Sequence, residues 1–389
     1  MQDDFGISET LKRQLNEYPT PFILLNPLKI QENIDSIRRQ LPEAKIFYST
    51  KANSLPKVLD VMCRMHTGFE INTAEELNRL KRIPGGENAT IINSSAVSSA
   101  TDVRALYQAG VRQFCADRKS YLQNLSINAP DALVSIRIKV PDFGSKFSMN
   151  SRFGTTLDEA SELIGVATKL GLNVNGIHFH VGSQASKPEN WRAGIHIAAK
   201  LFETYPSLKV LNLGGGLPGA YQPADDAIPT ILAAIKDELQ LTFQKQPDLY
   251  IELGRSLVAN AALTCASVIQ IEEQLPVSTA TLDISIFAGM IEIFESNYAI
   301  QYPIWTTGNG PLVEYQLEGP TCAGNDILTK HVTLPKLEVD FSQNTGTRVY
   351  FGKTGAYTLD YVRGSTSGFN GARIPKLLIL ENDKITQDG

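Results

Sequence analysis

The sequence has few cysteines, and the four it has lie far apart. They are Cys63, Cys115, Cys265 and Cys322, and no two of them form a CxxC pair. This spacing argues against a disulfide framework and against a cysteine-rich zinc site. It is typical of free thiols in a reducing compartment, so we expect a cytoplasmic protein.

The chain also lacks a surplus of basic residues and any long apolar run. It carries 36 Lys and Arg against 41 Asp and Glu, a net charge of −5, which disfavours nucleic acid or an anionic membrane as a partner. Residues 1–5 have neither the basic nor the apolar region of a signal peptide. No apolar stretch reaches the length that spans a bilayer. We therefore expect a small-molecule partner.

A regular alternation of strands and helices occupies residues 27–256 of the 389. Amphipathic stretches with apolar residues at helical spacing occur at 27–41, 156–170, 192–204 and 227–244. Between such stretches lie eight short apolar segments typical of buried parallel strands: 46–51, 68–73, 89–94, 113–117, 133–140, 176–182, 210–214 and 249–254. Eight strands with interleaved helices predict a TIM (β/α)8 barrel, an α/β fold.

The pattern changes after Ser256. Residues 257–389 are rich in Val, Ile, Thr and Tyr with Gly and Pro between them, which predicts a separate C-terminal β domain. One helical segment is expected near 284–295. Residues 1–26 contain an apolar run from Phe22 to Leu25, which we expect to join the β domain as an N-terminal strand. The predicted domains are thus 1–26 with 257–389, and 27–256.

Lys51 ends the first predicted barrel strand, where a TIM barrel places its functional groups. A lysine after an apolar strand is usually a surface residue on a loop. At the mouth of a barrel, however, a partly desolvated amine is well placed to bind a carbonyl cofactor as a Schiff base, because desolvation lowers its pKa. The other strand ends decide between these two interpretations.

The sixth predicted strand carries His178 and His180 on one face. Such an HxH pair occurs in metal-dependent barrel hydrolases, which makes that class the rival hypothesis. It would need further ligands at later strand ends, but the remaining histidines (His66, His196 and His331) lie elsewhere. A histidine here could also be a core residue bonded to the backbone, or an imidazole packed on a flat ring. No metal site is predicted.

The seventh strand ends in Gly214, Gly215 and Gly216. Consecutive glycines expose backbone N–H groups and let an anion approach closely. The loops after strands seven and eight form the usual phosphate site of these barrels. Arg255, after the eighth strand, can grip a phosphate through two hydrogen bonds.

The eighth strand also carries Glu252, a carboxylate at the end of an apolar strand, which needs a cationic partner. An ion pair between Glu252 and Arg255 is one interpretation. Together, however, the strand ends supply an amine, a contact for a ring face, a phosphate cradle and an anion. Pyridoxal 5′-phosphate requires this set of groups.

These motifs together resemble the fold-type III pyridoxal-phosphate decarboxylases, the group that contains ornithine, lysine, arginine and meso-diaminopimelate decarboxylases. The likeness runs over nearly the whole chain, with the motifs in order and suitably spaced. It implies a TIM barrel with a C-terminal β domain, as in alanine racemase, and the cofactor pyridoxal 5′-phosphate. Alanine racemase carries an arginine where this chain has Glu252, which favours decarboxylation over racemisation.

The resemblance also implies roles for individual residues. Lys51 would carry the cofactor as a Schiff base, His180 would stack on its ring, and Glu252 would pair with its ring nitrogen. The expected phosphate contacts are Ser183, Gly214, Gly215, Gly216, Arg255 and Tyr357, the last in the motif Gly355-Ala-Tyr357.

A homodimer with shared active sites is a further implication. Cys322, in the motif Gly319-Pro-Thr-Cys322, would reach the partner's site and protonate the carbanion after CO2 leaves. A free cysteine is otherwise most often a small buried residue. Arg152 and Asp326 match residues that pair across the interface, and Asp326 is also a candidate substrate contact. Both could instead be solvated charges.

The chain departs from the family at the substrate. Ornithine and diaminopimelate decarboxylases carry an acid after the cysteine, where this chain has Ala323; that removes a charge-assisted hydrogen bond of roughly 1.5–3 kcal/mol. Glu295, after Phe294, aligns with the second substrate acid but could be a surface charge. We expect a basic or conjugated diamino acid, in polyamine or siderophore metabolism. Alternatives are a meso-diaminopimelate, ornithine or lysine decarboxylase of primary metabolism, and a non-catalytic regulator.

Overall fold

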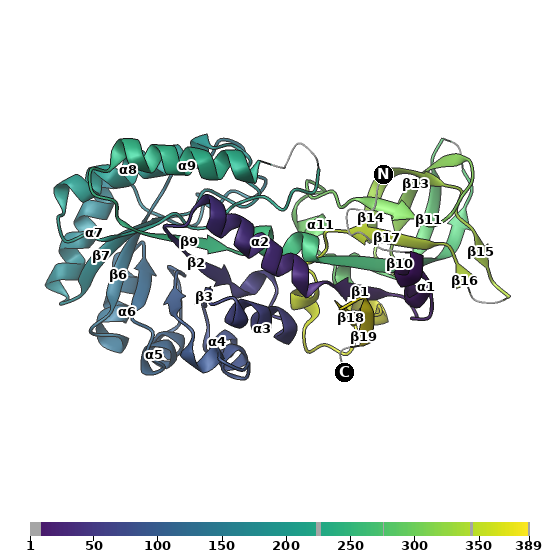
Figure 1. Cartoon of the computed structure of the whole chain (residues 1–389), viewed down its shortest axis with the longest axis horizontal. Helices are drawn as coiled ribbons and strands as arrows, with labels where there is room; N and C mark the ends of the chain where they lie inside the picture. Colours follow the sequence, from purple (N-terminus) through teal and green to yellow (C-terminus); the bar gives the residue numbers. More distant parts are fainter. Residues whose placement is uncertain (1–8, 223–226, 275, 343–344, 388–389) are drawn as a thin grey trace. The chain divides into compact units, whose positions relative to one another are not determined.

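The structure is a computed structural model, which describes residues 9–222, 227–274, 276–342 and 345–387. The chain forms two compact units. We call residues 31–220 and 224–256 the barrel unit, and residues 1–30, 221–223 and 257–389 the β unit. Both units can be followed by colour in Figure 1.

Eight parallel strands close the barrel, so the predicted TIM barrel is confirmed. Each strand pairs with the next in sequence, and β9 returns to β2 with Ala44 opposite Leu249. The strands are β2 (Ala44–Ser49), β3 (Gly68–Glu70), β4 (Ile91–Asn93), β5 (Gln113–Ala116), β6 (Leu133–Ile138), β7 (Asn173–Phe179), β8 (Val210–Asn212) and β9 (Asp248–Leu253). They are largely buried, which explains why apolar residues predominate in their sequences.

Helices cover the outside of these strands, as Figure 1 shows for α4 to α9. Thr73 and Thr156 begin α4 and α7 with capping boxes, in which the side chain of Glu76 or Glu159 accepts a hydrogen bond from the backbone N–H of the cap residue. All four predicted helices are present. The bounds are α2 (Pro27–Gln40), α3 (Pro56–Arg64), α4 (Ala74–Lys81), α5 (Ala100–Gln108), α6 (Lys119–Asn128), α7 (Leu157–Lys169), α8 (Glu189–Thr204) and α9 (Ile228–Thr242).

The β unit is built on a nine-stranded sheet with the order β14-β13-β11-β10-β1-β18-β19; β17 also pairs with β10, and β12 with β17. A separate pair is formed by β15 (Val339–Asp340) and β16 (Thr345–Gly346). The other bounds are β1 (Phe22–Leu25), β10 (Ala262–Glu272), β11 (Ser278–Leu282), β12 (Ile304–Thr306), β13 (Leu312–Glu318), β14 (Ile327–Pro335), β17 (Arg348–Gly352), β18 (Lys376–Glu381) and β19 (Lys384–Gln387).

The N-terminal segment is part of the core of this sheet. Strand β1 pairs antiparallel with β10 and parallel with β18. Helix α1 (Glu9–Asn16) places Leu11 and Leu15 in a buried cluster with Phe22, Leu263 and Leu378. Burial of these apolar side chains fixes α1 and β1 to the rest of the sheet.

The predicted helix near 284–295 is wrong as a continuous element. The segment contains a single 3-10 turn, η5 (Ile286–Ala288), and one helical turn, α11 (Glu292–Glu295). Gly289 separates them with a φ of +119°, a conformation that glycine adopts without steric cost and that ends a helix. In the part of the chain that the structure describes, no helix has the length and apolar character to cross a membrane.

Candidate active site

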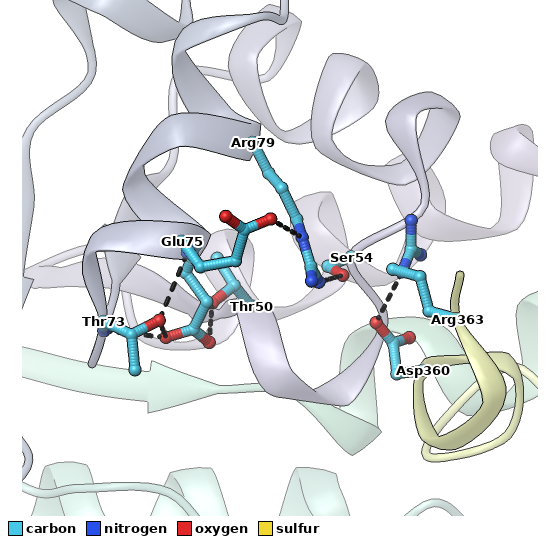
Figure 2. A network of polar contacts seen from close by, with 8 residues as sticks. Thr50, Ser54, Thr73, Glu75, Arg79, Asp360 and Arg363 are labelled. Atoms are coloured by element: carbon cyan, nitrogen blue, oxygen red, sulfur yellow. Dashed lines mark hydrogen bonds and ion pairs between the residues drawn. The ribbon is translucent and has the colours of Figure 1, made fainter. Parts of the chain in front are cut away.

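Lys51 lies just beyond the end of β2. The strand ends at Ser49, two residues earlier than predicted, and Lys51 sits in the short 3-10 helix η1 (Thr50–Ala52). The Thr50 hydroxyl donates to Oε1 of Glu76, at the start of α4, at 2.8 Å. Arg79 of the same helix donates to Ser54 Oγ at 3.1 Å (Figure 2). These bonds fix the segment that carries Lys51.

Glu252 is buried near the end of β9 and accepts several hydrogen bonds. Asn212 at the end of β8 donates to its Oε1 from 2.6 Å, and the Ser94 hydroxyl makes a short hydrogen bond to the same oxygen. His178 Nε2 lies 3.6 Å from this oxygen. Three other strand ends or loops therefore hold one carboxylate.

This environment keeps Glu252 ionised. Burial alone would raise the pKa of the carboxyl. His178 and the hydrogen bonds from Ser94 and Asn212 together outweigh burial and lower the pKa to about 2. A permanent anion at this strand end is what the ring nitrogen of pyridoxal phosphate requires in order to stay protonated.

The two histidines of the HxH motif have different surroundings. His178 is within the strand, 1% exposed, with Nδ1 3.3 Å from Cys115 Sγ, and burial lowers its pKa. His180 follows the strand, and its Nδ1 accepts a hydrogen bond from the Gly182 amide at 3.0 Å. Burial, Arg137 and Lys51 together lower the pKa of His180 well below its ordinary value. A neutral His180 is suited to stacking on an aromatic ring.

The three glycines leave no room for side chains. Gly214 and Gly216 have φ values of +62° and +117°. A Cβ atom at Gly214 would lie 2.1 Å from the Phe179 carbonyl oxygen, and one at Gly215 would lie 2.5 Å from the Glu252 carbonyl oxygen. The loop therefore packs directly on the ends of β7 and β9 and presents bare backbone.

Arg255 and Ser183 lie together beside this loop. The Arg255 guanidinium is buried, and its Nε and Nη2 atoms both lie 3.4 Å from Ser183 Oγ. Arg255 begins the short helix α10 (Arg255–Val258). A buried cation, a hydroxyl and exposed backbone amides form a donor set that fits a phosphate.

The residues of the barrel unit thus fit pyridoxal phosphate at both ends. The glycine loop, which has no room for side chains, fits the phosphate together with Ser183 and Arg255. The ionised Glu252 fits the pyridine nitrogen. Lys51 stands at another strand end of the same barrel. The barrel unit therefore contains every residue predicted to bind the cofactor except Tyr357.

The remaining predicted residues belong to the β unit. Cys322 is an exposed free thiol, and Tyr357 adopts a left-handed conformation with a φ of +55°. The Tyr361 hydroxyl donates to Glu295 Oε2 at 2.7 Å. Glu295 is exposed at the end of α11, so its carboxylate is oriented but accessible.

Asp326 is not a solvated charge. It is 3% exposed, and its carboxylate accepts from the Ile286 amide at 2.9 Å and from the Thr321 hydroxyl at 2.6 Å. These bonds brace the loop that carries Cys322. Contact with substrate therefore stays a prediction for Asp326, as does an interface role for the exposed Arg152.

Sequence reasoning missed several polar residues of this site. Ser94 and Asn212 hold Glu252, and Glu70 is buried at the end of β3. Arg137 of β6 is 8% exposed and lies over the ring of Phe153. Glu70 offered the same signal as Glu252, a carboxylate that ends an apolar strand.

Comparison with known proteins agrees with this geometry. The chain is 28% identical over 398 residues to the lysine/ornithine decarboxylase of Selenomonas ruminantium, covering 99% of this chain and 97% of the relative. It superposes on SrLDC solved in complex with PLP and cadaverine with a TM-score of 0.87, at 27% identity and over 98% of this chain and 96% of the other. Antizyme inhibitor 2 of Xenopus laevis is 27% identical over 86% of this chain and 75% of its own length.

Residues 28–259 match the family described as pyridoxal-dependent decarboxylase, pyridoxal binding domain. The match covers more than half of the chain, and the chain belongs to this family. It is a pyridoxal-phosphate-dependent amino-acid decarboxylase with a TIM barrel and a C-terminal β domain. The rival metal-dependent hydrolase is thereby set aside.

Proposed function

We propose that this enzyme removes the α-carboxylate of a basic or conjugated diamino acid. The observation that carries the proposal is the ionised, buried Glu252 at the same barrel end as Lys51. When bound, pyridoxal phosphate supplies an electron sink for the electron pair that remains when CO2 leaves. With the cofactor bound, Glu252 would hold the ring nitrogen protonated, and His180 would pack against the ring.

Binding of the cofactor falls to the other residues. In this proposal Lys51 would hold the cofactor through its aldehyde. The phosphate would be held by the Ser183 hydroxyl, by Arg255, by Tyr357 and by the backbone amides of Gly214, Gly215 and Gly216. The donor geometry around Ser183 and Arg255 supports this assignment for the barrel residues.

The substrate class follows from two residues of the β unit. Glu295 is an accessible carboxylate oriented by Tyr361, which suits a distal nitrogen with a hydrogen to donate. Ala323 offers no acid at the position after the cysteine, so Glu295 is the accessible carboxylate proposed to recognise that nitrogen. A distal amine that is acylated, and so uncharged, needs fewer acids than a free ammonium. The enzyme would then act in siderophore or related biosynthesis.

The experiment that tests the substrate class is CO2 release from a panel of amino acids. The panel contains ornithine, lysine, arginine, meso-diaminopimelate, 2,3-diaminopropionate and acyl or citryl conjugates of the diamino acids. We expect turnover of a conjugate with the α-amine and α-carboxylate free. Turnover of free ornithine or lysine with ordinary efficiency would overturn the proposal of a conjugated substrate. It would favour a decarboxylase of primary metabolism.

Glu295→Gln separates recognition from chemistry in the same assay. We expect KM for the preferred substrate to rise by about tenfold or more with kcat changed little, because a charge-assisted hydrogen bond is lost. Glu314→Gln is the matched control, an exposed glutamate of β13 paired with His331. An unchanged KM in Glu295→Gln would remove Glu295 from the substrate site.

We further propose that two copies pair so that Cys322 of one chain protonates the substrate Cα atom, in the site that contains Lys51 of the other chain. The exposure of the Cys322 thiol supports this, as does the loop that Asp326 braces. Its Sγ would give up a proton and be reprotonated from solvent.

Mixing two inactive variants tests the shared site directly. Lys51→Ala and Cys322→Ala should each lose amine production, and subunit exchange between them should restore about a quarter of wild-type activity, because half of the dimers then hold one intact site. Size-exclusion chromatography checks that both variants remain dimeric. Absence of any recovery, with exchange shown by differently tagged chains, would refute the shared site.

A further inference from the structure

Glu70 is a buried carboxyl that the proposed function does not use. It ends strand β3 and is 2% exposed. Its Oε2 atom has no hydrogen-bond partner among the described residues. A buried, unsatisfied carboxylate oxygen costs free energy, and such groups are often retained for function.

The register of the barrel places Glu70 beside the segment that carries Lys51. Glu70 is the residue opposite Ser49 in the parallel pairing of β2 and β3. The Thr50 hydroxyl has two acceptors within reach. One is the Glu70 carbonyl oxygen at 3.3 Å, and the other is Oε1 of Glu76. Lys51 comes directly after Thr50, so the two strand ends are joined immediately before it.

The charged groups around Glu70 come from several elements. Lys51 of η1 favours its ionised form, while Glu76 of α4 and Glu252 of β9 disfavour it. The negative charge of Glu70 also interacts with Cys115 of β5. Burial raises the pKa of that thiol well above its ordinary value, so the thiol stays neutral. Lys51 is thus the cation of this group.

The balance of these effects makes Glu70 titrate near neutrality. Burial is the largest effect and raises the pKa of Glu70 to about 7, against the attraction of Lys51 and a hydrogen bond with Ser49. A carboxyl with this pKa exchanges a proton readily at physiological pH. Glu252, in the same barrel, remains ionised throughout this range.

We propose that Glu70 is the counter-ion and proton partner of the Lys51 nitrogen. One proton passes between Lys51 Nζ and Glu70 Oε2: the N–H bond breaks, its electron pair stays on nitrogen, and an O–H bond forms. The pair goes from ammonium and carboxylate to amine and carboxylic acid, with no change in net charge. Glu70 acts through Lys51 and is a positioning residue. The inference rests on the proposed function in that Lys51 carries the cofactor.

A pH titration of the absorbance of the holoenzyme tests this pairing. The absorbance reports the protonation of the nitrogen that joins Lys51 to the cofactor. In Glu70→Gln, loss of the nearby anion should shift the midpoint to lower pH by about one to three units. Glu70→Asp keeps the charge and should restore most of the shift. Glu75→Gln, on an exposed glutamate paired with Arg79, removes the same charge and should move the midpoint by about 0.3 unit or less.

A second measurement needs no cofactor. Carbamylation of Lys51 by cyanate in the cofactor-free chain, followed by peptide mass spectrometry across pH, reports the fraction of free amine. Glu70→Gln should shift this profile to lower pH. A merely structural Glu70 would alter the melting temperature and leave both midpoints in place.

The outcomes separate this inference from the proposed function. Unchanged midpoints in Glu70→Gln, with a normal cofactor band, would overturn the pairing alone. If the wild-type protein showed no such band, or Lys51→Ala kept it, the proposed function itself would fail. A shift in Glu70→Gln that Glu70→Asp reverses supports the pairing.

Discussion

Replacing Lys51 with alanine is expected to remove both the covalently held cofactor and the activity. Alanine has no amine to join the cofactor aldehyde, and release of product loses its nucleophile. We expect CO2 release to fall by on the order of 10⁴-fold or more. The absorbance of the linked cofactor should disappear, and borohydride should no longer fix the cofactor to the chain.

Lys45→Ala is the matched control for this change. Lys45 lies on the same strand, β2, but is exposed and lies 5.6 Å from the centre of the Tyr250 ring. Its loss removes a cation–π contact of about 0.5–1 kcal/mol and no amine of the site. Normal absorbance is therefore expected for Lys45→Ala. A retained, borohydride-fixed cofactor in Lys51→Ala would show that another lysine carries it.

The sequence predicts the barrel well because its strands are buried on both faces. Short, largely buried strand segments such as 133–138 have no helical period, and the amphipathic stretches between them do. The eight-fold alternation then leaves few topologies open. The segment 284–295 misled the prediction because its apolar residues also fit a helix, and the left-handed turn at Gly289 is a property of the folded chain.

The candidate site is predictable only in part. Lys51, the glycines and Arg255 stand at strand ends, which the strand pattern locates. The support of Glu252 could not be found this way, because Ser94 is 158 positions away in sequence and follows β4, a strand that is not a neighbour of β9. Which polar side chains converge depends on closure of the barrel.

Glu252→Gln is the second change with a large expected effect. Glutamine keeps the shape of the side chain but removes the anion, so the ring nitrogen loses the charge that keeps it protonated. We expect kcat to fall by about 10²–10³-fold while the cofactor stays attached to Lys51. Stopped-flow absorbance and CO2 release measure the two quantities separately. Unchanged kcat would show that the reaction does not need this charge.

Ser94→Ala is the graded comparison for Glu252→Gln. It removes one hydrogen bond to the carboxylate and leaves Asn212 and the charge in place. The pKa of Glu252 should rise from about 2 but stay below neutrality, so activity at pH 8 should fall far less than in Glu252→Gln. A loss as large as that of Glu252→Gln would mean that orientation, rather than charge, is decisive.

Glu252→Gln also tests how the two buried carboxyls of the barrel, Glu252 and Glu70, are coupled. Glu252 has its pKa lowered to about 2 and Glu70 has its pKa raised to about 7, and the negative charge of Glu252 is one cause of the second shift. Glu252→Gln should therefore lower the pKa of Glu70, which carbon NMR of labelled glutamate can follow. Environments that separate two like groups in this way assign them different roles: Glu252 a fixed charge, Glu70 a proton carrier. A pKa of Glu70 that does not respond to Glu252→Gln would contradict this division.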